Sequence, residues 1–424
     1  MRTSFWRMWS ATGISKFGDG LVLVGLPLYT ASLTRGSVTA VASMAFVVRL
    51  PWLLLSLPAG AHADRRPFRR TMVISDIARF VLVAALALVI ALHLATLPIL
   101  FVIGFALGAF DTTFCAAAAN GLPAVVDDEE LPRANGRMCA VESAGEQVVG
   151  PAAAGLLYSF GAAVPFVGDA LSFLASAALL RKLPKGEAPV AADHDDSGAT
   201  LRSDMRDGVV HFVHNRLVRV LTLLVATWSF AQSAVYAVQV LYVTKVLGLP
   251  PRMFGVLLAT TAIFNVIGGL AAERVWNALG TMRLLVVTGV AITVAFVVAA
   301  RTSSPWIAAV CFGIEALATP AAIVATGTLR TRAVPAEMRG KVMNISRTLV
   351  IAAAAFGALA AGPIARSFGL RAPMYVGAGI FLTALVVAIR PVQAVLALLP
   401  DDAVALDDDR AVDNASAPLV PAMA

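Results

Sequence analysis

The sequence predicts an all-α membrane protein, with twelve transmembrane helices in two six-helix bundles and both termini in the cytoplasm. Three observations carry this prediction: the composition, the number of apolar segments and an internal repeat. Hydrophobic residues make up 59% of the 424 residues, charged residues make up 14%, and the mean hydropathy is +0.81. A soluble domain usually has about a quarter charged residues. Lipid is therefore the expected solvent for much of this chain, as in a multi-pass protein of the inner or plasma membrane.

Twelve apolar segments alternate with short breaks that are rich in charge, Gly or Pro. A helix that spans a bilayer needs about 20 residues, so a chain of this length can hold about a dozen spans with short loops. The predicted spans are 10–33, 40–62, 71–92, 97–119, 138–159, 163–181, 217–244, 253–272, 283–300, 305–328, 343–365 and 371–390.

A polar stretch at 182–216 divides the chain near its middle. We therefore expect an N-terminal six-helix bundle at 1–181, a cytoplasmic linker at 182–216 and a C-terminal six-helix bundle at 217–390. The last segment, 391–424, is rich in Ala and acidic residues. This composition is typical of a disordered tail, which we expect in the cytoplasm.

An internal repeat supports the division into two halves. The hexapeptide at 60–65 has a counterpart at 269–274, which is 209 positions later. The Ser-Phe-Gly sequence at 159–161 recurs at 367–369, which is 208 positions later. Two matches at nearly one offset indicate a duplicated six-helix unit, which is a common construction in transporters.

The positions of the basic residues predict the orientation, because loops rich in Lys and Arg stay in the cytoplasm. The termini, the even-numbered loops and the central linker hold 23 of the 33 Lys and Arg residues, and the odd-numbered loops hold 6. Both termini are therefore expected in the cytoplasm.

The basic loop between the second and third spans resembles a signature motif of the major facilitator superfamily of secondary transporters. In that motif a glycine is followed by an Asp-Arg pair and a basic cluster, which match Gly60, Asp64, Arg65, Arg69 and Arg70. The resemblance covers nearly the whole chain except its tail. It implies the major facilitator fold and transport by alternating access.

Shorter segments are similar to the enterobactin-exporter and macrolide-efflux branch of this superfamily. They lie at 7–9, 18–20, 76–79, 131–135, 150–151, 169–173 and 334–341. Membership in this branch would imply a proton-coupled antiporter that exports a drug, an antibiotic or a siderophore-like product.

Acidic residues outnumber basic residues within the predicted spans. A charged side chain at the centre of a bilayer costs about 2.5–3.5 kcal/mol, so each one needs a partner or a water-filled cavity. A carboxyl group in a poorly solvated cavity holds a proton more readily than one in water, which suits proton coupling. The leading candidates for proton coupling are Asp19 and Glu146, followed by Asp111 and Glu315. The acids within the spans are Asp19, Asp76, Asp111, Glu142, Glu146, Asp169 and Glu315, and the bases are Lys16, Arg49 and Arg79.

Some of these acids have an alternative structural explanation. Lys16 lies one turn before Asp19 and could pair with it without any role in coupling. Asp76 and Arg79 are three residues apart near the cytoplasmic end of their helix, so we assign them to a cytoplasmic gate. Glu142 is assigned to the same gate, together with the motif residues 60–70.

The seventh predicted span carries a polar and aromatic stripe. Trp228, Gln232, Tyr236 and Gln239 are spaced to share one helix face. This pattern suits the wall of a cavity for a bulky, partly polar substrate, to which Asn265 on the next span is added. A helix–helix contact with polar bonds is the alternative.

An enzyme is not expected. The sequence has no nucleotide-binding motif, no nucleophile elbow and no set of metal ligands with suitable spacing, so neither a cofactor nor a metal is predicted. The basic residues are scattered over short loops, which argues against nucleic-acid binding. We expect a monomer whose partners are a small-molecule substrate, protons and the lipid bilayer. A lipid flippase, a solute importer and a non-transporting membrane sensor are the alternatives.

Overall fold

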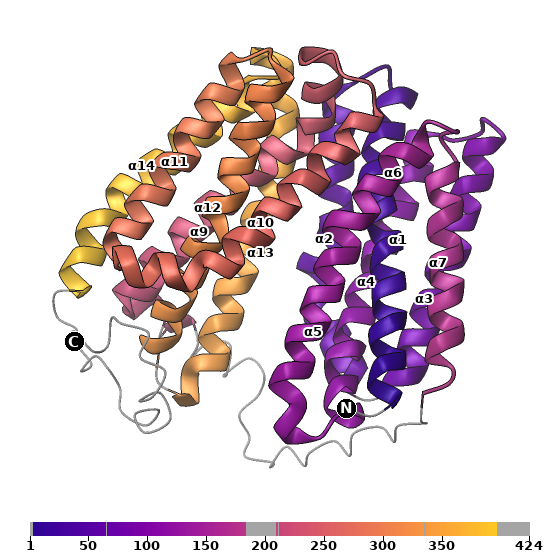
Figure 1. The fold of residues 1–424 in the computed structure, drawn as a ribbon, viewed down its shortest axis with the longest axis horizontal. Coiled ribbons are helices and arrows are strands. Elements are labelled where there is room, and N and C mark those ends of the chain that lie inside the picture. Colours follow the sequence, from indigo (N-terminus) through magenta and orange to yellow (C-terminus); the bar gives the residue numbers. More distant parts are fainter. Residues whose placement is uncertain (1–2, 65, 184–208, 211, 335, 397–424) are drawn as a thin grey trace. The chain divides into compact units, whose positions relative to one another are not determined.

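The computed structural model describes residues 3–64, 66–183, 209–210, 212–334 and 336–396, and nearly all of them are helical. The chain divides into two compact units. Unit 1 comprises residues 1–195 and 237–262, and unit 2 comprises residues 196–236 and 263–424. Residues 397–424 of the predicted tail (391–424) and residues 184–208 of the predicted linker lie outside the described residues, whereas residues 391–396 form the end of a helix. Figure 1 shows the order of the helices.

Unit 1 contains the helices of the first half of the chain. They are α1 (Thr3–Leu33), α2 (Val38–Asp64), α3 (Phe68–Ala91), α4 (Leu97–Val125), η1 (Asp128–Glu130), α5 (Leu131–Ser143), η2 (Ala144–Val149), α6 (Gly150–Tyr158) and α7 (Val164–Leu180). Helix α1 packs against α7 and against the continuous run α5–η2–α6, while α2 packs against α4. This arrangement surrounds α1 with neighbours, so its polar side chains are held inside the protein.

The helices of the second half follow in chain order. They are α9 (Arg216–Leu241), η3 (Tyr242–Val246), α10 (Arg252–Leu279), α11 (Thr281–Arg301), α12 (Pro305–Arg332), α13 (Ala336–Phe368) and α14 (Ala372–Leu396). The unit boundary falls at the end of α9 and inside α10. Within unit 2, α11 packs against both α12 and α14.

Nine helices in the described residues are long and apolar enough to cross a membrane. Of the other three predicted spans, 10–33 lies in α1, which contains Lys16 and Asp19, and 163–181 corresponds to the 17-residue helix α7. The predicted span 138–159 is divided among α5, η2 and α6. Polar residues lower the hydropathy of α1 and α5: Lys16 of α1 is buried in the protein, whereas Arg133 and Asn135 of α5 are exposed.

Most helices extend beyond the apolar runs that predicted them. Helix α10 continues to Leu279, whereas its predicted span ends at 272, because exposed polar residues such as Glu273 and Arg274 prolong it. The two copies of the Ser-Phe-Gly repeat lie at equivalent places: the first follows α6, and the second covers the last two residues of α13 and the glycine after it.

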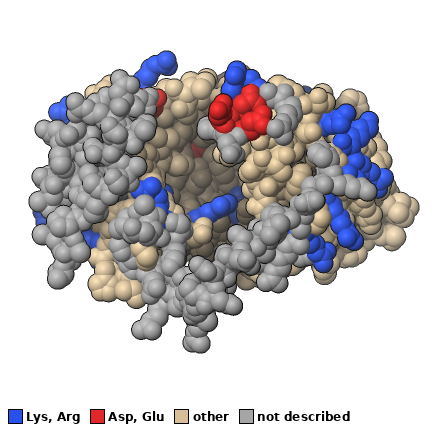
Figure 2. Space-filling view, turned by 90° about the horizontal axis from the view of Figure 1, so that it is seen from below, with Lys and Arg blue, Asp and Glu red and all other residues tan. Residues whose placement is uncertain are grey.

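Figure 2 shows Lys and Arg side chains at several separate places on the surface in view, whereas the acidic side chains gather mainly at one place.

Candidate functional site

A lysine in α1 lies at the centre of three carboxylates from three different segments of unit 1. The Nζ atom of Lys16 is 2.9 Å from Asp19 Oδ2, 2.9 Å from Asp111 Oδ1 and 3.3 Å from Glu146 Oε2. Asp19 is on α1, Asp111 on α4 and Glu146 on η2. Three of the four predicted coupling acids therefore share one cation.

An arginine in α3 joins the same cluster from its buried side. The guanidinium of Arg79 pairs with Asp76 at 2.5 Å, with Asp111 at 3.3 Å and with Asp19 at 3.4 Å. It also donates to Ser15 Oγ at 3.1 Å. Arg79 and Asp76 were assigned to a gate from the sequence; in the structure they belong to the same ionic network as Asp19.

Two aromatic rings hold this guanidinium in place. Its carbon lies 4.6 Å from the centre of the Phe114 ring and 4.4 Å from the centre of the Phe173 ring. Cation–π contacts of this kind are stronger where water is excluded. The sequence contains no pattern that could have predicted them, because the rings come from α4 and α7.

A close approach of α1 to η2 brings Glu146 to Lys16. A Cβ atom on Gly20 would lie 2.8 Å from the backbone oxygen of Glu146 and 2.9 Å from Cα of Gly150. Glycine is therefore required here, since backbone atoms of η2 and α6 cannot move aside as a side chain could. η2 is a π-helical turn, and such turns are frequent at functional sites.

The network has more negative than positive groups. Asp19, Asp76, Asp111 and Glu146 face two bases, so full ionisation would leave two uncompensated negative charges. The side chains of Lys16 and Arg79 are only 6% and 1% exposed, whereas those of Asp19, Asp111 and Glu146 are 18–38% exposed. Uncompensated charge in a poorly solvated site is costly, so the cluster is suited to take up a proton or a cation on its accessible, acidic side.

Asp169 lies close to this network, but it is fully buried. Its Oδ1 atom accepts a hydrogen bond from Ser172 at 3.3 Å, and the side chain lies against Gly18 of α1. Arg49 lies apart from the network, since its Nη1 atom donates to the backbone oxygen of Ala45 at 3.4 Å.

A second buried carboxylate lies in unit 2. Oε1 of Glu315 accepts hydrogen bonds from Gln232 at 2.8 Å and from Thr319 at 3.3 Å, and Oε2 accepts one from Tyr236 at 2.8 Å. The stripe predicted on the seventh span thus contacts the fourth coupling candidate. The contribution of Thr319 could have been found from its position one turn after Glu315.

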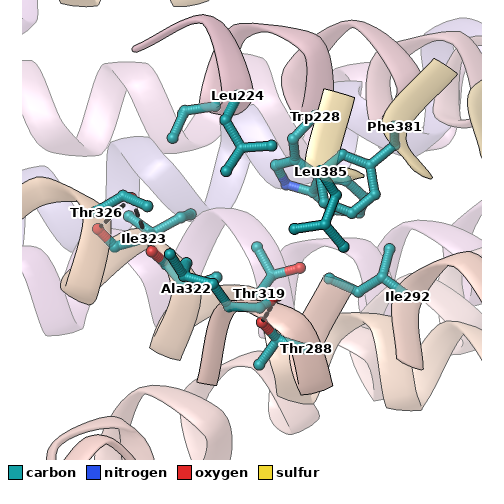
Figure 3. A pocket seen from close by; sticks show the side chains of 12 residues that line it. Leu224, Trp228, Thr288, Ile292, Thr319, Ala322, Ile323, Thr326, Phe381 and Leu385 are labelled. Atoms are coloured by element: carbon teal, nitrogen blue, oxygen red, sulfur yellow. Dashed lines mark hydrogen bonds between the residues drawn. The ribbon is translucent and has the colours of Figure 1, made fainter. Parts of the chain in front are cut away.

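A small pocket, with a volume of about 30 Å³, lies among helices of unit 2 (Figure 3). Trp228 lines it, together with residues of α11, α12 and α14. Gln232, Tyr236 and Asn265 are not among its lining residues; Asn265 donates to the backbone oxygen of Ala316 at 3.3 Å. Gln239 is buried, and within the described residues neither of its side-chain polar atoms has a hydrogen-bond partner.

The predicted gate residues are described only in part. Arg65 and the side chain of Asp64 lie outside the described residues, and Gly60 is described only as part of helix α2. Arg69 donates to the backbone oxygen of Leu183 at 2.8 Å, and Arg70 is exposed. Glu142 lies in α5, one turn before Glu146.

A metal site is not seen in the part of the chain that the structure describes. It contains no group of three or more His, Cys, Asp or Glu side chains that could hold a metal ion.

Comparison with known proteins agrees with this architecture. The family model of the Major Facilitator Superfamily matches residues 8–314 and 232–423. The multidrug efflux pump Tap of Mycolicibacterium fortuitum is 26% identical over 366 residues, which are 84% of this chain and 87% of the pump.

Solved structures of transporters have the same fold. A variant of the nucleoside transporter NupG matches with a TM-score of 0.77 at 10% identity, over 92% of this chain and 100% of that protein. An inward-facing bacterial homologue of the iron transporter ferroportin matches with a TM-score of 0.75 at 17% identity, over 92% and 99%. The chain is a multi-pass transporter of the cell membrane, and it belongs to the Major Facilitator Superfamily.

Proposed function

We propose that this transporter exports a small molecule, such as a drug, an antibiotic or a siderophore-like product, in exchange for protons. The observation that carries the proposal is the ionic network of unit 1, in which four carboxylates share two bases. The similarity to the efflux pump Tap supports export over import. Alternating access is the mechanism that such transporters generally use.

Proton coupling follows from the charge of the network. A proton on one carboxylate removes one of the two uncompensated charges. Protonation would then favour one state of the transport cycle over the other, and substrate that prefers the opposite state would exchange with protons. Asp19 and Glu146 are the proposed coupling residues because both contact Lys16 and are partly exposed, and Asp111 joins them through the same lysine.

We further propose that all twelve predicted segments cross the membrane. Helices α1 and α7 and the run α5–η2–α6 would then complete the set formed by the nine long apolar helices. The excess of Lys and Arg in the termini, the even-numbered loops and the linker supports a cytoplasmic location of both termini, since Lys and Arg are retained on that side. Residues 1–181 and 217–390 would form the two bundles.

The substrate site is proposed around Trp228, Gln232 and Tyr236 of α9. Gln239 of the same helix and Asn265 of α10 are proposed as further members of this site. The motif at 60–70 is proposed as the cytoplasmic gate, in which Asp64 would form contacts that differ between states of the transport cycle.

The test uses purified protein in proteoliposomes with an imposed pH gradient and a fluorescent or radiolabelled drug. We expect flux to follow the gradient. Asp19→Asn and Glu146→Gln should abolish gradient-driven flux and spare substrate exchange, whereas Asp64→Asn should slow both. Glu129→Gln, at an exposed acid of η1, is the matched control and should behave as the unmodified protein.

Flux that ignores the pH gradient and follows a sodium gradient would refute proton coupling. Substrate binding without flux would favour a sensor. Full coupling in both Asp19→Asn and Glu146→Gln would refute the residue assignment and leave the exchange mechanism intact.

A further inference from the structure

A cluster of four bases, Arg7, Arg69, Arg181 and Lys182, lies at one end of unit 1. Arg7 and Arg69 lie near the starts of α1 and α3, whereas the other two directly follow α7. Arg7 Nη1 donates to the backbone oxygen of Lys182 at 3.0 Å. Arg69 Nη1 donates to the backbone oxygen of Leu183, the next residue, at 2.8 Å. Side chains from two helices are thus held at the same turn of the chain, and we refer to the four bases as the basic cluster.

The hydrophobic core fixes this turn in place. Leu183 is only 2% exposed, and it belongs to one cluster of buried side chains with Phe5 of α1 and Phe68 of α3. Phe5 lies two residues before Arg7, and Phe68 lies directly before Arg69. The positions of both arginines are therefore set by the packing of three helices.

The basic cluster has no counter-charge in the ranges that the structure describes. None of its four side chains forms an ion pair with a carboxylate there. Arg7, Arg181 and Lys182 are exposed. A guanidinium has more N–H donors than one backbone oxygen can use, and its planar fork matches the oxygens of a phosphate group. The cluster is therefore suited to bind a phosphate.

An exposed apolar face of α7 leads to the basic cluster. Val167, Leu171 and Leu174 are 48%, 60% and 48% exposed, and their spacing of four and three residues places them on one face of the helix. Lipid is the expected neighbour of such a face in a multi-pass membrane protein. The ten residues from Leu171 to Arg181 span about 15 Å, which is half of a hydrocarbon core about 30 Å thick. This length fits an acyl chain of one leaflet.

Trp6 indicates the depth of the basic cluster in the membrane. Its ring is 44% exposed and contacts the rings of Phe5 and Trp9, with centres 5.3 Å and 5.6 Å away. The guanidinium carbon of Arg137 lies 5.3 Å from the centre of the same ring. Exposed tryptophans in membrane proteins are enriched at the level of the lipid head groups. Arg7, the next residue, is therefore expected at the depth of the lipid phosphates.

We propose that the basic cluster and the outer face of α7 bind an anionic phospholipid. Its phosphate lies at Arg7, Arg181 and Lys182, and an acyl chain lies along Leu171 and Leu174. A zwitterionic lipid would bring a cation of its own to the basic cluster, and a free phosphate ion would leave the apolar face unused. This lipid is a partner distinct from the transported molecule, so the proposal does not depend on the substrate or the coupling ion.

The test compares two lipids that differ only in the charge of the head group. The full chain is delipidated in detergent and titrated with phosphatidylglycerol or with phosphatidylcholine of the same acyl chains, and bound lipid is counted by native mass spectrometry. We expect phosphatidylglycerol to bind about tenfold more tightly, because several basic side chains face its uncompensated phosphate.

Two variants test the residues of the basic cluster. Arg7→Gln, Arg181→Gln and Lys182→Gln together should weaken binding of phosphatidylglycerol about tenfold and change that of phosphatidylcholine by less than about twofold. Arg181→Gln with Lys182→Gln keeps the hydrogen bond of Arg7 and should weaken binding of phosphatidylglycerol about threefold. This double variant gives the answer if the triple variant does not fold, as judged by its size-exclusion profile and melting curve.

The matched control removes the same number of positive charges elsewhere. Arg252→Gln, Arg283→Gln and Arg301→Gln together replace three exposed arginines outside the basic cluster. The affinities of this variant for both lipids should stay within about twofold of those of the unmodified protein, because charges far from the bound phosphate are screened by salt.

The proposal is overturned if phosphatidylglycerol binds no more tightly than phosphatidylcholine, or if the folded variants of the basic cluster keep their affinity for phosphatidylglycerol. Equal weakening in the control variant would show attraction by the overall charge, and it would overturn the proposal as well. Sodium phosphate should displace the lipid no better than sodium chloride of equal ionic strength. Stronger displacement by phosphate would assign the basic cluster to a free anion instead of a lipid.

Discussion

Arg79 gives the sharpest test of the ionic network, because it is nearly inaccessible and faces three carboxylates. Replacement by Met keeps a side chain of similar length between Phe114 and Phe173 and removes the charge. Asp76 is fully buried and its ion pair with Arg79 is the shortest in the network, so it loses its counter-charge.

Arg79→Met is expected to lower the free energy of unfolding by a large amount. Removing one partner of a buried ion pair destabilises a protein by about 3–5 kcal/mol, since the remaining charge stays uncompensated. Adding Asp76→Asn to Arg79→Met removes that charge, and we expect the double variant to recover about 2 kcal/mol, a coupling typical of groups in direct contact.

The control is Arg49→Met, a second arginine in the helices of unit 1. Arg49 donates to a backbone oxygen of its own helix, and in the described residues it pairs with no carboxylate. Its replacement should cost less than about 1 kcal/mol, because no buried charge loses its partner.

The assay is equilibrium unfolding by sodium dodecyl sulfate in maltoside micelles, followed by circular dichroism. Equal destabilisation by Arg79→Met and Arg49→Met would refute the reasoning. So would a double variant that is less stable than Arg79→Met alone.

Two further predictions address packing and topology. Gly20→Ala should destabilise the protein by about 1–3 kcal/mol in the same assay, because the added methyl group meets the backbone of η2, whereas Gly136→Ala in α5 has free space and should be neutral or stabilising. A stable Gly20→Ala variant would argue against the close contact of α1 with η2. Single cysteines at 66 and 130 should react with an impermeant maleimide only in opened cells, and cysteines at 249 and 303 should react in intact cells; the reverse pattern would invert the proposed orientation.

The sequence predicts the helices well because a helix that spans the membrane needs a run of apolar residues within its own segment. It also predicts pairs within a helix, such as Lys16 with Asp19 and Asp76 with Arg79, since a spacing of three residues brings side chains together. The bond between Lys16 and Asp111 depends on how α1 packs against α4, which no local pattern encodes.

Irregular helix geometry is a second feature that the sequence does not predict. A regular helix would place Glu142, Glu146 and Gly150 in one row, but the π turn at Ala144–Val149 falls between the first and the last of them. Irregular turns depend on tertiary contacts, here the approach of Gly20, so a pattern based on 3.6 residues per turn cannot anticipate them.

The π turn also bears on how the two halves diverged. The repeat offset falls from 209 before this turn to 208 after it, so the first half holds one residue more between its two matches. One extra residue is what a π turn adds to a helix, and the corresponding helix of the second half, α13, is α-helical throughout its described length. If the alignment gap is placed in this turn, Glu142 is matched with Ile351 and Gly150 with Ala358. A single inserted residue would then mark the point where an ancestral duplicate acquired acidic chemistry that its sister copy lacks.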